Sequence, residues 1–519
     1  MSADAPNHTP TKKLRIATCS LAGCFGCHMS FLDVDEALAD LIEHIEFDRS
    51  PFTDIKHVSE GGVDIGLIEG GLCNKENVEV LREFRARCTT LVAVGACAMY
   101  GGVPALRNGI PVSELVAEAY LGDDLHFFHL ASPDLLFGFD DAVAHRNIVG
   151  VLQDERELGL QGIRMRKYGQ EIIRLLTGKR VHGTGSVPGG FNKPLSVADR
   201  DLMRADIGQI IAWCDSALAL ARDLFLRGQP EQGRFANFPS GFMSLVRPDG
   251  AADLYDGALR VKDAQGQLIV DQVDVHDYQQ LIVEEVKPWT YMKFPHLRAL
   301  GPEHGWYRVG PLARINNATY FDTPHAEAAR AEFMAWGHGQ PVTASLAQHW
   351  ARMIDTLHCA EGIARLLDDP DITGTDLMAT GTPLREGIGV IEAPRGTLLH
   401  HYRIGDNDLV EYANLIVSTT HNNTAMNEAV RSVAAEYFDG REITEGLLNH
   451  IEVAIRAYDP CLSCATHAVG KMPLRIEVVE SDGQLADVLL KHEDGTLERP
   501  MAHAEPVDRT PANWPPLDA

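Results

Sequence analysis

The stretch LRIATCSLAGCFGC, residues 14–27, runs from a short apolar segment directly into a loop of cysteine and glycine. Two further apolar runs of similar length follow it, Val63–Ile68 and Leu91–Val94. Runs this short and this apolar are typical of buried parallel strands. Residues 31–45 and 75–87 lie between them and combine helical spacing with many charges. Strands that alternate with helices predict an α/β domain with a parallel sheet from residue 14 to about 120.

Each predicted strand ends in a loop of unusual composition. The first enters residues 19–27, the second enters EGG at 69–71, and the third enters GAC at 95–97. Because the carboxyl ends of parallel strands share one edge of a sheet, these loops should converge. Cys24 and Cys27 with interleaved glycines, together with the cysteine of the third loop, favour an iron–sulfur site, since backbone amides can then turn toward cluster sulfur. A thioredoxin-like pair or unreactive buried thiols are the alternatives.

The character of the chain changes from about residue 125. Long helical patterns cover 202–227, 326–336 and 343–367. Residues 257–274 (GALRVKDAQGQLIVDQVD) predict a β-hairpin across a turn that contains glycine. Two more strands are predicted near the C-terminus, at Leu474–Val479 and Leu485–Leu490. The second part of the chain is therefore expected to be mainly helical.

A second cysteine motif, DPCLSCATH, occupies residues 459–467. Cys461 and Cys464 are spaced so that both sulfurs can reach one centre, and thiolate is a soft ligand that suits nickel, iron, copper(I) or zinc. His467 adds a nitrogen donor three residues later. The spacing excludes c-type haem attachment, in which histidine follows the second cysteine directly. Zinc would accept the two cysteines and the histidine with a water as fourth ligand.

The totals limit the classes of function. The chain has 519 residues, 45% of them hydrophobic, and a formal net charge of −27. This charge argues against non-specific nucleic-acid binding. No stretch of apolar residues is long enough for a transmembrane helix, so no membrane span is expected. Ten cysteines that include two CxxC pairs indicate metal or redox ligands in a reducing compartment, and we expect a cytoplasmic protein.

The N-terminal motifs resemble those of [NiFe]-hydrogenase small subunits. The resemblance covers LRIATCSLAGCFGCHMSFLD (14–33), IGLIEGG (65–71) and VAVGACAMYGG (92–102), and it is greatest for the cytoplasmic, NAD-linked type. It implies a flavodoxin-like fold. It also implies that Cys24, Cys27 and Cys97 bind a [4Fe–4S] cluster, with Glu69 beside them.

Residues from about 125 to 467 are similar to [NiFe]-hydrogenase large subunits. The motifs follow the large-subunit order: LHFFHLASPDLLFG (125–138), HGTGSVPGGFNKP (182–194), YRVGPLARIN (307–316), EAPRGTLLHHY (392–402), STTHNN (418–423) and DPCLSCATH (459–467). The resemblance implies that Cys461 and Cys464 bind a Ni–Fe(CN)2CO centre. It places Arg395 as a fixed cation over an open metal position. The other implied site residues are Asp134 and Asp459 as acidic partners, Pro394, Thr419 and Thr420 around the diatomic ligands of iron, and His467 as a Mg2+ ligand.

The chain departs from the family pattern in two places. Large subunits carry a second CxxC in an Arg-x-Cys-Gly-x-Cys context, whose thiolates complete a four-sulfur nickel shell, and small subunits carry a fourth cluster cysteine in a Pro-Gly-Cys-Pro-Pro context. Neither motif occurs in this sequence. The sequence therefore predicts a head-to-tail join: a small-subunit-like domain over 1–122, a large-subunit-like domain over 123–467, and a C-terminal extension over 468–519 that a maturation peptidase removes.

The function implied by the resemblance is the reversible reaction H2 ⇌ 2 H+ + 2 e−. Electrons would leave through the iron–sulfur cluster to diaphorase subunits that carry FMN, further iron–sulfur clusters and NAD. We expect Cys461, Cys464, Arg395 and Asp134 to face one cavity, and the cluster edge of the N-terminal sheet to face it too. A non-catalytic hydrogenase-derived scaffold and a zinc protein are the alternatives. Because thiolates are missing, we expect little or no activity from the chain alone.

Overall fold

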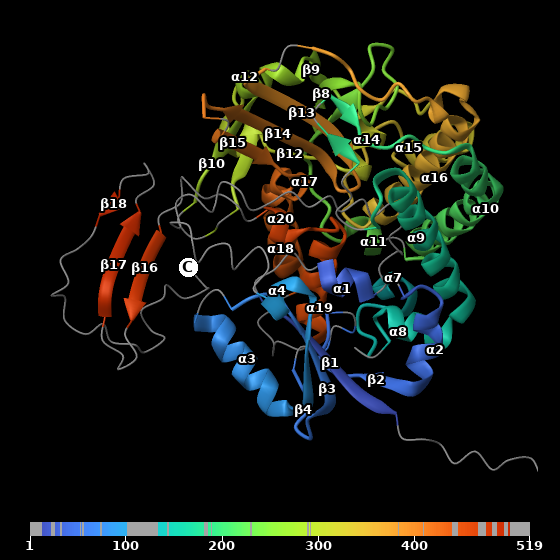
Figure 1. Cartoon of the computed structure of the whole chain (residues 1–519). Coiled ribbons are helices and arrows are strands. Elements are labelled where there is room, and N and C mark those ends of the chain that lie inside the picture. Colours follow the sequence, from blue (N-terminus) through green and yellow to red (C-terminus); the bar gives the residue numbers. More distant parts are fainter. Residues whose placement is uncertain are drawn as a thin grey trace, which may run out of the picture.

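A computed structural model describes residues 13–21, 26–31, 34–51, 53, 55, 57–72, 75–100, 133–142, 145–180, 185–187, 189–228, 231–287, 290, 292–381, 384–407, 409–437, 445–465, 474–479, 485–491 and 497–498. Figure 1 shows the N-terminal sheet below a larger body of helices and smaller sheets. No helix in these ranges combines the length and the apolar character needed to cross a membrane.

The N-terminal domain contains a four-stranded sheet of order β2-β1-β3-β4, in which every pairing is parallel. Its strands are β1 (Leu14–Ser20), β2 (Ile45–Phe47), β3 (Val63–Glu69) and β4 (Cys88–Val94). The associated helices are α1 (Gly26–Phe31), α2 (Ala37–His44), α3 (Lys75–Arg87) and α4 (Gly95–Tyr100). The predicted parallel α/β arrangement is confirmed.

The helical pattern predicted over 31–45 is divided in the structure. Helix α1 ends at Phe31 and α2 begins at Ala37. Asp35, between them, has φ of 57°, in the left-handed region that a right-handed helix cannot include. The helical spacing therefore predicted α2 correctly, but the backbone conformation before Ala37 decides where this helix begins.

Long helices form the centre of the second part of the chain. Three of them were predicted, namely α10 (Val197–Arg227), α15 (Pro324–Trp336) and α16 (Ala347–Asp368), and α9 (Arg156–Thr177) was not. The Ser196 hydroxyl accepts a hydrogen bond from the Asp199 amide at 3.0 Å and so caps the start of α10. Helix α9 ends at Thr177 and is followed by Gly178, whose φ of 85° suits a residue without a side chain.

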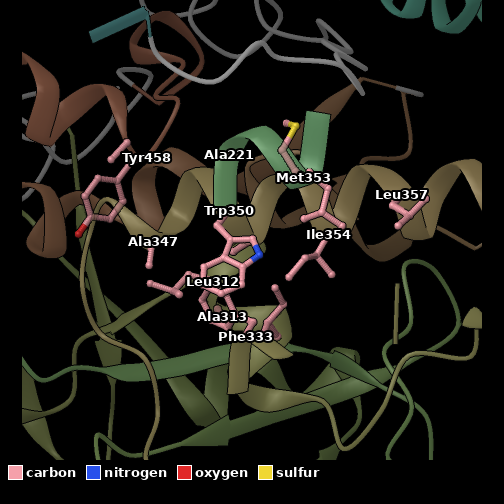
Figure 2. Close-up of a cluster of buried hydrophobic side chains, with 14 of the residues drawn as sticks. Ala221, Leu312, Ala313, Phe333, Ala347, Trp350, Met353, Ile354, Leu357 and Tyr458 are labelled. Atoms are coloured by element: carbon pink, nitrogen blue, oxygen red, sulfur yellow. The ribbon is translucent and has the colours of Figure 1, made fainter. Parts of the chain in front are cut away.

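The main apolar core lies between α10, α14 (Pro311–Asn317), α15 and α16. Trp350 on α16 is 1% exposed and packs against Phe225 and Phe333. Figure 2 shows the Trp350 indole beside Leu312, Ala313, Phe333 and Ile354. Burial of this aromatic cluster holds α14 and α16 against one another. Both helices carry residues of the candidate site.

Three small sheets cover this helical core. One has the order β12-β7-β8-β9, with β7 (Gly241–Val246), β8 (Ala258–Lys262), β9 (Leu268–Val273) and β12 (Tyr307–Arg308). Strands β8 and β9 are the predicted hairpin. The second is antiparallel, with β13 (Glu386–Ala393), β14 (Gly396–Ile404) and β15 (Val410–Ile416). The third pairs β10 (Ile282–Glu285) with β11 (Phe294–Leu297).

The remaining elements are short helices and strands. Helices near the candidate site are α7 (Pro133–Phe137), α8 (Ile148–Asp154), α17 (Ser418–His421), α18 (Asn423–Tyr437), α19 (Glu445–Arg456) and α20 (Leu462–Ala465). A separate antiparallel sheet has the order β16-β17-β18, with β16 (Leu474–Val479), β17 (Leu485–Lys491) and β18 (Leu497–Glu498). Its first two strands were predicted. The other short elements are β5 (Ser186–Val187), β6 (Gly190–Phe191), α11 (Glu231–Arg234), α12 (Tyr278–Leu281) and α13 (Gly301–His304).

The N-terminal domain contacts the rest of the chain through α8 and α9. Leu152 and Ile163 from these helices share one apolar cluster with Ile16 and Leu38 of the N-terminal domain. Around it, Lys167 Nζ donates to Glu36 at 3.0 Å, and further ion pairs join Arg164 to Glu36 and Arg180 to Asp35. The apolar cluster therefore supplies the contact and the ion pairs surround it.

Candidate functional site

The carboxyl edge of the N-terminal sheet brings two of the predicted cluster loops together. Cys27 lies in α1, and Gly95 begins α4 directly after β4. A Cβ placed on Gly95 would lie only 2.1 Å from Cys27 Sγ, so this sulfur lies against the Gly95 backbone. Cys97 follows two residues later, within the same short helix. The loops that carry Cys27 and Cys97 therefore meet, whereas Cys24 lies outside the described residues.

Glu69, at the end of β3, is buried beside these loops and holds the loop that carries Cys27. Its carboxylate accepts hydrogen bonds from the Ser20 hydroxyl at 2.8 Å and from the His28 amide at 3.0 Å, and His28 Nδ1 lies 3.0 Å from Oε1. Burial would raise the pKa of Glu69, but the bonds and charge of His28 and the Ser20 hydroxyl hold it below its ordinary value. Glu69 therefore adjoins the loop that carries Cys27, and its place beside a cluster stays a prediction. Its partners Ser20 and His28 were not singled out in the sequence, although each is next to a predicted loop residue or strand end.

The C-terminal cysteine motif begins with an unusual backbone conformation. Asp459 has φ of 51°, which is rare for a residue with a side chain. The chain then turns through Pro460 into Cys461 and α20. The Cys461 amide donates to the Thr419 hydroxyl at 3.0 Å, and the Thr420 hydroxyl lies 3.5 Å from the Ala465 carbonyl. Helix α17 therefore supports the segment that carries Cys461.

The structure also brings Arg395 to this segment. Pro394 and Arg395 connect β13 to β14, whose end residues Ala393 and Gly396 are paired. Arg395 Nε donates to the Asp459 carbonyl at 2.6 Å and lies 3.4 Å from its carboxylate. The Pro394–Arg395 turn, Thr419 and the Asp459–Cys461 segment are distant in sequence, and the fold joins them through Arg395 to Asp459 and through Thr419 to Cys461. Cys464 lies in α20, and His467 lies outside the described residues.

Asp134 lies in α7 and is 1% exposed. Its carboxylate accepts from Asn449 Nδ2 at 3.1 Å and from Arg456 Nη1 at 3.2 Å. Both partners are on α19, the helix that leads toward Asp459. These bonds tie α7 to the C-terminal motif. That Asp134 faces one cavity with Arg395 and the two cysteines stays a prediction. That the carboxyl edge of the N-terminal sheet faces this cavity also stays a prediction.

A buried charged group beneath the site was missed in the sequence. Arg314 in α14 is 3% exposed and bonds both Asp355 and Glu392. About one turn earlier on α16, Arg352 Nη2 donates to the Ala457 carbonyl at 2.9 Å, just before Asp459. Burial lowers the pKa of His349, on the same helix, to about 3, so this imidazole is neutral. Arg314 lies in a quoted motif, but sequence alone does not reveal that its partners are buried with it.

The other described cysteines of the second part of the chain are unsuited to metal binding. Cys214 is 1% exposed, and burial raises its pKa far above the ordinary thiol value. Burial raises the pKa of Cys359 to about 12. Both thiols are therefore protonated at neutral pH, whereas the thiolate is the ligand form. Within the described ranges, no group of three or more histidine, cysteine, aspartate or glutamate side chains is arranged to hold a metal ion.

The available donors therefore fit the family's metal centre only in part. Cys461 and Cys464 can supply two thiolates, and no second CxxC remains in this part of the sequence. The four-thiolate nickel shell implied by the resemblance is not completed by this chain. Cys24, Cys27 and Cys97 likewise supply three thiolates to a cluster for which four are usual.

Comparison with known proteins relates the two parts of the chain to two families. Residues 24–134 match the family described as "NADH ubiquinone oxidoreductase, 20 Kd subunit", and residues 254–467 match "Nickel-dependent hydrogenase". These matches confirm the predicted fold class, a parallel α/β domain followed by a hydrogenase large-subunit fold. The domain boundaries at 122 and 467 stay predictions.

Individual relatives agree with this division. The chain is 44% identical over 371 residues to the NAD-reducing hydrogenase HoxS subunit beta of Cupriavidus necator, an alignment that covers 70% of this chain and 76% of that subunit. It is 49% identical over 109 residues to subunit delta from the same organism, covering 21% of this chain and 52% of that subunit. A crystal structure of an NAD+-reducing [NiFe]-hydrogenase in the H2-reduced state superposes with a TM-score of 0.64 at 52% identity, covering 66% of this chain and 76% of that one. The chain therefore belongs to the nickel-dependent hydrogenases, and joins a small-subunit-like domain to a large-subunit-like domain that lacks its N-terminal nickel motif.

Proposed function

We propose that this chain serves reversible hydrogen oxidation in an NAD-linked hydrogenase, and that it carries both the cluster-binding and the metal-binding parts. Cys461 and Cys464 would hold the metal centre, and Cys24, Cys27 and Cys97 the [4Fe–4S] cluster. One observation supports this most strongly. The guanidinium of Arg395 bonds the Asp459 carbonyl, and the Thr419 hydroxyl accepts from the Cys461 amide. Three separate hydrogenase motifs, which contain Arg395, Thr419 and Cys461, therefore adjoin at one place.

The residues of the chain have separate tasks in this proposal. Arg395 presents a fixed cation at the turn that leads into Cys461, because its Nε is held by Asp459. The Thr419 hydroxyl fixes the Cys461 amide, which orients the first thiol. Glu69 keeps the Cys27 loop on the sheet edge by accepting bonds from Ser20 and His28. Such orientation of ligands by their neighbours governs both affinity and potential at metal sites.

Electrons released by H2 oxidation would leave through the cluster to diaphorase subunits that carry FMN, iron–sulfur clusters and NAD. A maturation peptidase would cleave after His467, and the freed histidine would then bind Mg2+. Mass spectrometry of the chain recovered from a cell that expresses the peptidase tests the cleavage. A C-terminal peptide that ends at His467 is the expected product, and a full-length chain at full nickel loading would contradict it.

The donor set leads us to expect little or no turnover from the purified chain. Two thiolates leave the family's nickel shell incomplete, so water or another residue must fill the remaining positions. Anaerobic H2-dependent dye reduction tests this, with nickel content and the infrared bands of iron-bound CO and CN− measured on the same sample. Stoichiometric nickel with sustained turnover, lost in Cys461→Ser but kept in Cys214→Ser, would show that the missing motif is dispensable.

A zinc protein without hydrogenase activity is the second candidate. It is favoured by one observation, namely that the chain supplies two cysteines and one histidine at 461–467, which zinc accepts with a water. Metal analysis of the purified chain separates the candidates. One zinc per chain, lost in both Cys461→Ser and His467→Asn and accompanied by no iron, would favour zinc. Iron and nickel in the unmodified chain would exclude it. A metal-free chain that still associates with diaphorase subunits would favour the scaffold.

A further inference from the structure

The turn that carries Arg395 rests on a buried guanidinium. Arg314 Nε donates to Asp355 at 2.8 Å, and its Nη1 donates to Glu392 at 2.7 Å. The side chains of Arg314 and Glu392 are 3% and 0% exposed. Burial opposes the charge of Arg314, but the two carboxylates outweigh it and raise the pKa of Arg314 above its ordinary value. Arg314 is therefore a permanent cation inside the protein.

Arg314 also binds the backbone of the turn. Its Nη1 donates to the Ala393 carbonyl at 3.1 Å, and its Nη2 donates to the Pro394 carbonyl at 3.3 Å. These are the two residues that precede Arg395. Glu392, one residue earlier, is fixed in turn by the Thr397 hydroxyl at 2.6 Å and the Leu245 amide at 3.1 Å. A planar guanidinium can reach all of these acceptors at once because its donors point in several directions.

Close backbone packing also holds the same turn. Gly310 directly precedes α14, and a Cβ on it would lie 2.7 Å from the Arg395 carbonyl. Gly310 and Arg314 are therefore both held against the turn by one helix. From that turn, Arg395 Nε reaches the Asp459 carbonyl at 2.6 Å, and the chain continues to Cys461. A continuous series of contacts thus runs from α14 through the turn to the cysteine motif.

We propose that Arg314 is a positioning residue, which fixes the Pro394–Arg395 turn so that Arg395 in turn holds the Asp459–Cys461 segment in the geometry of the thiolate site. This assignment rests on the metal site proposed above. A buried ion pair of Arg314 with Asp355 and Glu392 alone would serve stability only. The bonds to the Ala393 and Pro394 carbonyls distinguish the two roles, because they act on the turn itself.

Cobalt(II) is a suitable probe of the site, because its thiolate complexes absorb visible light. The full chain is reduced and freed of metal under anaerobic conditions, and titrated with Co2+. The difference between its spectrum and that of Cys461→Ser isolates the band at the C-terminal site. We expect Arg314→Gln to shift this band and to weaken Co2+ binding at least about tenfold, the scale seen when groups that orient ligands are removed. Arg395→Gln should do the same.

The double variant Arg314→Gln/Arg395→Gln tests whether Arg314 acts through Arg395. We expect the double variant to resemble Arg395→Gln alone, within about twofold in Co2+ affinity, because residues in one series of contacts are not additive. Arg260→Gln is the matched control. Arg260 is also a buried guanidinium, but its bonds go to Asp271 and Thr319. It should lose stability without moving the cobalt band.

The outcomes separate this assignment from the proposed function. A cobalt band that is unchanged in Arg314→Gln, or effects that add in the double variant, would overturn the role of Arg314 while the metal site stands. No Cys461-dependent band in the unmodified chain would overturn both. If Arg314→Gln does not fold, Arg314→Lys is tested in its place, because lysine keeps the positive charge but cannot bond all of the acceptors at once. A normal cobalt band and normal hydrogen exchange at residues 393–397 in Arg314→Lys would also overturn the assignment.

Discussion

At the scale of single residues, burial decides which titratable groups of the candidate site are charged. The His421 side chain lies in α17, directly after Thr419 and Thr420, and is 1% exposed. Its Nδ1 lies 2.8 Å from the Tyr307 hydroxyl. Burial lowers the pKa of His421 to about 3, so the ring is neutral in the folded chain. Histidine in an unfolded chain titrates near pH 6.5, at roughly the value for model peptides.

This difference predicts a loss of stability in mild acid. Below about pH 6.5 the unfolded chain binds a proton at His421 that the folded chain does not, so stability falls as pH falls, by about 1.4 kcal/mol per unit for one such group. Urea unfolding at pH 7.5, 6.5 and 5.5 measures the slope. His421→Gln should flatten it by roughly one proton. Equal slopes in His421→Gln and the unmodified chain would mean that this imidazole is charged when folded.

At the scale of elements, two glycines let the β13–β14 turn pack against the start of α14. Gly396 has φ of 129°, and a Cβ on it would lie 2.4 Å from Val309 Cγ2 and 2.5 Å from the Gly310 amide nitrogen. The Gly310 nitrogen, and Val309 Cβ at 2.8 Å, cannot move away without shifting the backbone that also holds Arg395. The glycine of the Ala-Pro-Arg-Gly motif is therefore explained by close approach of two backbone segments.

Gly396→Ala should accordingly destabilise the chain by about 1–3 kcal/mol, the cost of forcing a side chain into a strained backbone region, with the steric contact in addition. Gly387→Ala is the control on the paired strand β13, because an added Cβ there meets nothing within 4 Å. It should stay within about 0.5 kcal/mol of the unmodified chain. Chemical unfolding followed by tryptophan fluorescence measures both. Equal stability of the two variants would contradict the packing of the turn on α14.

At the scale of the whole molecule, the contact between the two predicted domains depends on few apolar residues. Leu152 in α8 is 1% exposed and belongs to the cluster that joins α8 and α9 to β1 and α2. A Cβ on Gly159 would lie 2.6 Å from Leu152 Cδ2, so α8 and α9 pack closely here. The ion pairs around the cluster are partly exposed, and such pairs contribute about 0–1 kcal/mol each.

Leu152→Ala should therefore weaken the contact by about 2–5 kcal/mol, the usual cost of such a cavity. We expect calorimetry to show the N-terminal domain unfolding before the rest, with faster hydrogen exchange in β1 and β3. Leu202→Ala on α10 is the matched control, since Leu202 is 58% exposed. A single unfolding transition at the same temperature in Leu152→Ala would mean that another contact holds the domains together.

Much of the fold and part of the site could be predicted from local sequence. The strands β1, β3 and β4, the long helices α10, α15 and α16, and the β8–β9 hairpin all follow from the spacing of apolar residues, which is set by the geometry of each element. The interruption at Asp35 was not predictable, because the same charged residues fit a continuous helix and only the backbone conformation at that position breaks it.

The sequence by itself determined the order of the motifs, the cysteines that can act as ligands and the thiolates that are missing, because these depend only on residue identity and spacing. Only the tertiary structure decided which residues hold the site in place. Asp134 bonds Arg456, 322 positions away, and Arg314 bonds the turn at Ala393 and Pro394. Contacts of this kind leave no periodic signal in the sequence. They arise where helices and strands pack together and a buried polar group must find its partner in whatever segment the fold places beside it.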